Sequence, residues 1–316
     1  MRRLALSLLA LVGFFLLLLS ARTVAFRSRQ TTPQPADPMT FDRAAALERL
    51  SRAIQFRTVS NHDPAQTSFD EFAHFRDFLH EAFPLVGKQL VREIVAGHSL
   101  LYTWPGEDSA IKPLLLMAHM DVVPANERGW RHAPFSGALA AGYVWGRGAM
   151  DDKSSLLAIL ESVERLLGEG FRPKRTVYLA FGHDEEIGGH GGAAKIAELL
   201  RSRGVSLELV VDEGLNILNG IVPGIASPVA LIGIAEKGYL SLRLTARARG
   251  GHSSIPPPEN AIGILSRALQ RLEATPFPSR LGAATRQMFE YHGPEMSWPN
   301  RLALANLWRY DPLVRK

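Results

Sequence analysis

The order of apolar and polar positions predicts helices and buried strands in turn through the middle of the chain. Apolar residues recur at the spacing of an amphipathic helix in four segments: 41–56, 69–83, 154–167 and 193–201. Continuous apolar runs, which are typical of strands buried on both faces, occupy three others: 114–118, 177–181 and 207–211. From residue 114 onwards strands and helices alternate, and that order predicts a doubly wound α/β sheet.

The N-terminal residues carry a different pattern. Arg2 and Arg3 precede an apolar stretch, 4–19, which only small Ser and Gly residues interrupt. Positive charge before such a stretch is the pattern of an export signal, and 23–25 offers small residues for cleavage. The stretch is slightly short of the ~20 residues of a comfortable membrane span. We therefore expect residues 1–26 to be a signal peptide or a signal anchor, in a secreted or membrane-anchored protein.

The remaining patterns divide the chain further. Residues 27–39 are polar and rich in proline, so they are expected to form a linker. After Glu236 the pattern changes, because apolar and polar residues alternate from 239 to 246 as they do in a half-exposed strand. We expect a catalytic domain at 40–236 and a smaller α+β domain at 237–316.

Acidic residues and histidines gather where the apolar runs end. Three of these groups closely follow predicted strands, and ligand sites in open α/β sheets form at the carboxyl ends of strands. Hard carboxylates and imidazoles brought together in this way suit a divalent ion such as zinc. The groups are His119-Met120-Asp121, Asp151-Asp152, Asp184-Glu185-Glu186, Asp212-Glu213 and Gly251-His252.

Each group alone has an ordinary explanation, such as a helix cap, a turn or a loop histidine. The three adjacent carboxylates at 184–186, however, repel one another unless a cation neutralises them. One of them can bind metal while its neighbour acts as general base. His119 can coordinate while Asp121 accepts its other ring N–H. Asp151 and Asp152 exceed what a helix cap needs, so one can bridge two ions while the other stays solvated.

Composition narrows the chemistry. Because the chain has no cysteine, any metal must be held by His, Asp and Glu. The net charge is +5, but the Lys and Arg residues are scattered, which disfavours nucleic acid as a partner. A metal-independent hydrolase is poorly supported, since there is neither a cysteine nucleophile nor a Gly-x-Ser-x-Gly elbow.

Taken in order, the groups resemble the motifs of the zinc-dependent aminoacylase and carboxypeptidase S family of exopeptidases. The tail EMSWPNRLALANLW resembles the carboxypeptidase S-like branch, which includes secreted enzymes that hydrolyse or synthesise N-fatty-acyl amino acids. The resemblance implies a doubly wound catalytic domain with an inserted lid and dimerisation domain, and so suggests a homodimer. The matching motifs, spread over 114–254, are LLLMAHMDVVP, GRGAMDDK, GHDEEIGG, VVDEG and GGHSS.

The resemblance also implies a role for each residue. Asp121 would orient its neighbouring histidine, Glu185 would be the general base, and His252 of the second domain would polarise the substrate carbonyl. Asp151, joined to the next residue by a cis peptide bond, would bridge two metal ions. The other metal ligands would be His119, Glu186 and either Asp212 or Glu213, because family members differ in which of the last two they use.

The implied reaction is hydrolysis of the amide bond of a short peptide or an N-acyl amino acid. Two zinc ions roughly 3.5–4 Å apart would activate a bridging water, and Glu185 would take its proton and pass it to the leaving amine. Cobalt or manganese would suit the same ligands.

The resemblance departs from the family at the C-terminus. Family members carry a final histidine ligand far downstream, whereas here the sequence stops at Lys316, and His292 in EYHGPEM does not match that motif. We therefore expect a chain truncated inside its second domain. The alternative is a catalytically incomplete, membrane-tethered remnant that lacks the last histidine ligand.

Overall fold

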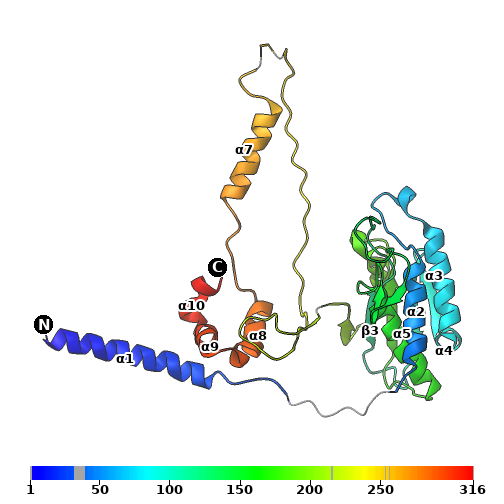
Figure 1. Ribbon diagram of the computed structural model, residues 1–316, viewed down its shortest axis with the longest axis horizontal. Coiled ribbons are helices and arrows are strands. Elements are labelled where there is room, and N and C mark those ends of the chain that lie inside the picture. The colour runs from blue at the N-terminus through cyan, green and yellow to red at the C-terminus, as the bar shows by residue number, and fades with distance from the viewer. Residues whose placement is uncertain (1, 32–39, 215, 253, 256, 316) are drawn as a thin grey trace. The chain divides into compact units, whose positions relative to one another are not determined.

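The computed structural model describes residues 2–31, 40–214, 216–252, 254–255 and 257–315. By its internal contacts the chain divides into two units (Figure 1). One unit is Ala36–Glu213, and the other combines Met1–Pro35 with Gly214–Lys316. Each unit is described by itself.

A five-stranded mixed sheet forms the centre of the unit 36–213. Its strand order is β1-β2-β6-β3-β7, in which β6, β3 and β7 run parallel while β1 and β2 are antiparallel additions. The carboxyl ends of β6, β3 and β7 therefore lie at one edge of the sheet, and the acidic groups follow these ends. The strands are β1 (Val91–Val95), β2 (Ser99–Trp104), β3 (Leu114–His119), β6 (Val177–Gly182) and β7 (Leu209–Val211).

Helices cover both faces of this sheet, and the two cores between them explain the order of apolar positions. On one face the helices bury aromatic and aliphatic side chains such as Phe72, Phe75 and Leu160 against the sheet. On the other face a single helix buries Ile196 and Leu200. The first face carries α2 (Arg43–Gln55), α3 (Phe69–Ala82), α4 (Pro84–Gln89) and α5 (Lys153–Gly168), and the second carries α6 (Ala193–Ser202) (Figure 1).

The connections between the parallel strands alternate in direction. The connection from β3 to β6 contains α5, and the connection from β6 through α6 passes to β7 on the opposite side of β3. This is the doubly wound arrangement that the sequence predicts. The remaining elements of this unit are short: η1 (Pro64–Gln66), η2 (Glu185–Ile187) and the hairpin of β4 (Ala138–Ala140) with β5 (Tyr143–Trp145).

The second unit is mainly helical among its described residues. Its N-terminal helix α1 (Arg2–Ala25) is long and apolar enough to cross a membrane, by length and composition only. A two-residue pairing joins β8 to β9. The other elements are β8 (Ile217–Leu218), β9 (Val229–Ala230), α7 (Ala261–Ala274), α8 (Ala283–His292), η3 (Gly293–Glu295), α9 (Trp298–Ala305) and α10 (Leu307–Val314).

Two of the expected strands differ from the structure. The side chains of β7 are about half exposed rather than buried on both faces, because within the described residues β7 pairs only with β3 at the edge of the sheet. The segment 239–246 is fully described and is not a strand. Tyr239 and Leu240 are largely exposed there, so alternation alone was not enough: a strand also needs a partner for its backbone groups. An inserted α+β lid domain stays a prediction.

Candidate metal centre

His119 stands at the centre of the site. It is the last residue of β3 and is almost fully buried. Its Nε2 lies 2.9 Å from Asp151 Oδ1, 3.5 Å from Glu213 Oε2 and 3.9 Å from Glu185 Oε2. The structure thus brings carboxylates from three separate loops onto one imidazole nitrogen.

Two groups of three residues share this histidine. In one, His119 meets Asp151 and Glu186; in the other, it meets Asp152 and Glu213. Within each group the ligand atoms lie within 4.8 Å of one another. Imidazole nitrogen with carboxylate oxygens is a donor set that zinc, cobalt and manganese accept. The residues present therefore fit a divalent metal.

Asp152 is the residue whose surroundings fit a cation best. Its residue is 1% exposed, and neither carboxylate oxygen has a hydrogen-bond partner in the described part of the chain. Buried polar atoms are normally paired, so an orphaned carboxylate beside His119 calls for a positive charge. The peptide bond between Asp151 and Asp152 is cis, as the resemblance implies. The side chain of Asp151 is the exposed member of the pair, at 68%.

Asp121 links the histidine to the acidic loop. Its carboxylate is fully buried and accepts hydrogen bonds from the backbone N–H groups of Glu185, at 3.0 Å, and Glu186, at 3.1 Å. His119 Nδ1 lies 2.9 Å from the backbone oxygen of Asp121 and 3.3 Å from its Oδ1. Asp121 thus fixes both the histidine ring and the backbone that carries the two glutamates.

Ser60 completes the surroundings of Asp121. Its hydroxyl donates to Asp121 Oδ2 at 2.6 Å. A parallel β-bridge between Val59 and Val122 holds the two segments together, and the hydroxyl of Thr58 donates to the Met120 oxygen at 2.7 Å. Burial opposes ionisation of Asp121, but the hydrogen bonds from His119 and Ser60 hold the pKa of its carboxyl below the usual range.

Glycines allow the acidic loop to fold tightly. Gly188 has a φ of 106°, a left-handed conformation that favours glycine, and it ends the short helix η2. A Cβ added to Gly192 would lie 2.5 Å from Asp184 Oδ1. Asp184 Oδ2 in turn accepts the N–H of Gly191 at 2.6 Å. The close packing expected of these glycines is present.

The ionisation of the site shows an excess of negative charge. Burial raises the pKa of Glu185 and of Glu186, and nearby carboxylates add to the effect. Burial and the charges of Asp152 and Asp151 raise the pKa of Glu213 to about 7. Burial alone would lower the pKa of His119, but its hydrogen bond with Asp121 and the surrounding carboxylates raise it to about 10. A divalent cation at this position would offset the excess negative charge.

Lys153 is a buried cation at the start of α5. Its Nζ donates to the backbone oxygens of Ala53, at 2.9 Å, and Phe56, at 2.7 Å, and lies 4.8 Å from the ring centroid of Phe75. These oxygens end helix α2, so Lys153 ties α2 to the segment that carries Asp151. Burial lowers the pKa of this amine to about 7.

The structure separates the remaining predicted residues. Glu213 approaches His119, whereas Asp212 is exposed and its Oδ1 accepts the N–H of Glu213 at 2.9 Å. His252 belongs to the other unit, where its Nδ1 lies 2.7 Å from Ser254 Oγ. The sequence interpretation placed Asp152 in a candidate group without a ligand role, and it missed Ser60 and Lys153 as parts of the site. Only Asp152 left a signal, as the second acid of a pair that a helix cap does not need.

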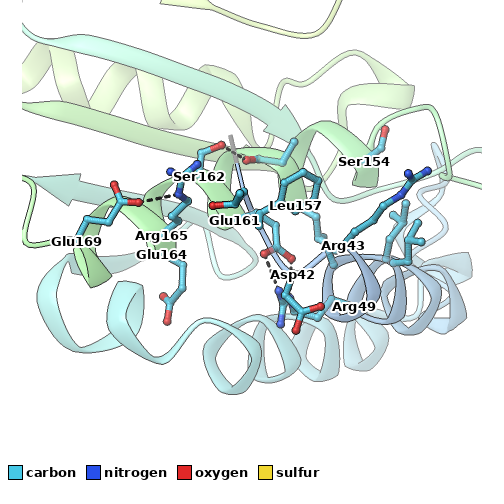
Figure 2. A pocket seen from close by; sticks show the side chains of 16 residues that line it. Asp42, Arg43, Arg49, Ser154, Leu157, Glu161, Ser162, Glu164, Arg165 and Glu169 are labelled. Atoms are coloured by element: carbon cyan, nitrogen blue, oxygen red, sulfur yellow. Dashed lines mark hydrogen bonds and ion pairs between the residues drawn. The ribbon is translucent and has the colours of Figure 1, made fainter. Parts of the chain in front are cut away.

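A surface pocket of about 710 Å³ lies away from these ligands, along helices α2 and α5 (Figure 2). Apolar side chains such as Leu47 and Leu157 line it, and Arg49 and Glu161 pair across it at 2.6 Å. None of the candidate metal ligands lines this pocket. The pocket is therefore separate from the candidate metal centre.

The chain is similar to known proteins over most of its length. Residues 115–298 match the model of peptidase family M20/M25/M40. A probable carboxypeptidase S-like 2 of Dictyostelium discoideum is 42% identical, over 97% of this chain and 61% of the relative. The N-fatty-acyl-amino acid synthase/hydrolase PM20D1 of Mus musculus is 43% identical, over 92% of this chain and 59% of the relative.

The chain is also similar to a third relative and to a solved structure. Carboxypeptidase S of Saccharomyces cerevisiae is 40% identical, over 74% of this chain and 42% of its own length. The crystal structure of an M20 family metallo-carboxypeptidase from Sulfolobus solfataricus superposes with a TM-score of 0.44 at 22% identity, covering 56% of this chain and 38% of that one. The chain spans about three fifths of the length of the first of these relatives.

Proposed function

The chain belongs to peptidase family M20/M25/M40, and on that premise we propose that it is a metal-dependent hydrolase of short peptides or N-acyl amino acids. The observation that carries the proposal is that two pairs of carboxylates lie around the buried imidazole of His119. Without a cation, burying several carboxylates together costs free energy. With a bound metal ion, the same carboxylates can hold a catalytic centre.

Two zinc ions are the metals we expect, with cobalt or manganese as substitutes. His119, Asp151 and Glu186 would hold one ion, and Glu213 and the buried Asp152 would supply ligands to the other. Bound metal supplies a Lewis acid and lowers the pKa of a coordinated water. Asp121 keeps the histidine ring and the two glutamates in position for those ions through its buried hydrogen bonds.

Glu185 is the proposed proton carrier. It follows β6 directly beside the ligand Glu186, yet it belongs to neither group of candidate ligands. Its raised pKa brings the carboxylate closer to the range in which it exchanges protons near neutral pH. It would accept the proton of the attacking water and deliver it to the nitrogen of the departing amine.

The substrate would be the amide of an amino acid with a free carboxylate. Relatives carry the names of both carboxypeptidases and N-fatty-acyl-amino acid synthase/hydrolases, so both substrate classes are proposed. His252 of the second domain would polarise the substrate carbonyl, and Glu213 rather than Asp212 is the proposed ligand. The alternative of a catalytically incomplete remnant that lacks the last histidine ligand is not favoured, since four carboxylates meet His119 and the proposed base Glu185 lies beside them.

The setting of the enzyme is part of the proposal. We expect residues 1–26 to direct export, as a signal peptide or an anchor that tethers the protein to a membrane, since α1 has the length and hydropathy to span one. We also propose a catalytic domain at 40–236, an inserted lid and dimerisation domain at 237–316, and a homodimer formed through the latter.

One assay tests the proposed function. The protein is incubated with zinc, and hydrolysis of an N-fatty-acyl phenylalanine and of an unblocked dipeptide is followed by amine release. We expect turnover of at least one substrate, its loss after treatment with a chelator, and its recovery when zinc is restored. Turnover that persists after complete metal removal would exclude a metal-dependent mechanism.

A further inference from the structure

Helix α1 is covered along one narrow stripe. Leu19 and Thr23, four residues apart, are 3% and 0% exposed, and Phe15 continues the stripe by one turn. The neighbouring Leu16 and Leu17 are more than half exposed. The stripe is covered by α9 and by Asn306 and Trp308, which belong to the same unit as α1.

A buried asparagine makes polar contacts with the stripe. Asn306 joins α9 to α10 and is fully buried. Its Nδ2 donates to the Leu19 oxygen at 3.2 Å and lies 3.3 Å from Thr23 Oγ1, while also reaching the Leu302 oxygen at 2.9 Å. Two of these three contacts are with α1, so the buried amide ties the junction of α9 and α10 to that helix.

Aromatic and glycine contacts extend the same interface. The rings of Phe15 and Trp308 meet edge to face, with centroids 5.9 Å apart and planes at 83°. At the other end of the stripe, a Cβ added to Gly293 would lie 2.5 Å from the ring of Phe26. The fit therefore extends from within α1 to the residue just beyond its end.

The segment that follows α1 is held as well. Arg301 donates to the Phe26 oxygen at 2.5 Å, and Arg29 pairs with Glu290 at 2.7 Å. Gln30 Nε2 donates to the Tyr291 oxygen at 3.1 Å. These polar contacts join residues that are more than 260 positions apart in the sequence.

From these contacts we propose that the apolar N-terminal segment is retained in the mature protein, as an anchor helix whose C-terminal end docks on α8–α10. Removal after Ala25 would take away the Leu19 and Thr23 contacts of Asn306 and the ring that Trp308 meets. Residues 2–14, which precede the docked stripe, form about 20 Å of apolar helix that stays free to insert into a membrane whose hydrocarbon core is ~30 Å thick. This inference rests on the proposed membrane attachment and is independent of the proposed hydrolysis.

The intact mass of the purified wild-type protein tests retention. The full chain is expressed in cells that export it, membranes are washed with alkaline carbonate, and the protein is extracted with detergent. We expect it to stay with the membranes and its mass to include residues 2–25. A mature protein that lacks these residues would overturn the inference, even if hydrolysis of the test substrates is found.

Cysteine cross-linking tests the docking, because the chain contains no cysteine of its own. Arg29→Cys with Glu290→Cys replaces a contacting pair, and a short bismaleimide should join the two in washed membranes. Ser28→Cys with Glu290→Cys is the matched control, since in the described part of the chain the Ser28 hydroxyl accepts the N–H of Gln30 at 3.1 Å and forms no hydrogen bond with Glu290. Asn306→Leu should lower the cross-linked fraction at least two-fold, whereas Asn300→Leu, an exposed position of α9, should not. Equal cross-linking of both pairs, or none of the contacting pair in a retained protein, would overturn the docking.

Discussion

The carboxylate of Asp121 joins three segments that lie far apart in the sequence. It accepts a hydrogen bond from the hydroxyl of Ser60 and lies beside the ring of His119. It also accepts hydrogen bonds from the backbone N–H groups of Glu185 and Glu186. Hydrogen bonds to a charged, buried acceptor are stronger than neutral ones. A single side chain therefore sets the position of a proposed ligand and of the proposed base together.

Replacement of Ser60 by alanine tests this role. The variant loses a 2.6 Å hydrogen bond to Asp121, and outer partners of metal ligands typically matter by about 10- to 100-fold in metal affinity or activity. We expect a loss of that order in zinc affinity or kcat, measured by competition with a chelating dye and by the substrate assay. Ser60→Thr keeps the hydroxyl and should stay close to wild type. An alanine variant unchanged in both measurements would contradict the role.

The pH dependence of zinc binding follows from Glu213 and His119. In the metal-free protein the pKa of Glu213 is about 7 and that of His119 about 10, and zinc must displace both protons. Above a pH of about 7 only the histidine proton competes, so log K should rise by about one per pH unit. Below it Glu213 is protonated as well, and the slope should approach about two.

Calorimetric titration with zinc at several pH values measures this slope. Glu213→Gln removes the second proton and should bind more weakly, with a slope of about one throughout. A wild-type slope that does not change across neutral pH would contradict the participation of Glu213.

The site residues that could be predicted from the sequence are those that belong to local sequence motifs. His119, Glu185 and Glu186 follow apolar strands, and strand ends in a parallel sheet meet at one edge. Ser60 carries no such signal, because its role depends on a hydrogen bond to Asp121, 61 positions away in the sequence. Lys153 looks like an ordinary polar start of a helix until its burial is seen.

At the scale of the element, the loop after β6 depends on glycine for its shape. The position of Gly192 lies against Asp184 Oδ1, Ser99 Oγ and the backbone nitrogen of His183, all within 3.0 Å of an added Cβ. Two of these neighbours belong to the fold of the acidic loop itself. The loop that holds Glu185 and Glu186 therefore has little freedom to accommodate a side chain there.

Gly192→Ala should destabilise this loop. Overpacking of this kind costs about 1–3 kcal/mol, and we expect that loss in the free energy of unfolding together with weaker zinc binding. Chemical denaturation and zinc titration give the two values. Gly233→Ala is the matched control, because nothing lies within 4 Å of a Cβ at that position. Equal stability of the two variants would show that the loop relaxes freely.

The elements that the sequence predicted well are those whose pattern repeats over several turns or is fully apolar. Helices α2, α3, α5 and α6 lie within a few residues of their expected bounds. The burial of β7 and the strand at 239–246 were wrong, because both depend on what packs beside them rather than on the local pattern. The sequence of one segment does not show which other segments pack beside it.

At the scale of the whole molecule, the proposed metal ligands all lie in one unit and His252 lies in the other. The ligand cluster forms within the unit 36–213, so metal binding and carbonyl polarisation are separable properties. The family could be predicted from sequence because five short motifs occur in a fixed order. The docking of α1 could not, since an apolar helix predicts a membrane span and says nothing of Asn306.

The central claim is that the carboxylates around His119 hold metal for a hydrolysis in which Glu185 moves the proton. The most direct measurement compares turnover and zinc content of Glu185→Gln with those of wild type and of Glu198→Gln, an exposed glutamate of α6. Loss of a general base costs about 10²- to 10⁴-fold. We predict that loss in kcat for Glu185→Gln, with zinc content unchanged and Glu198→Gln as active as wild type. Turnover retained by a fully loaded Glu185→Gln protein would contradict the account.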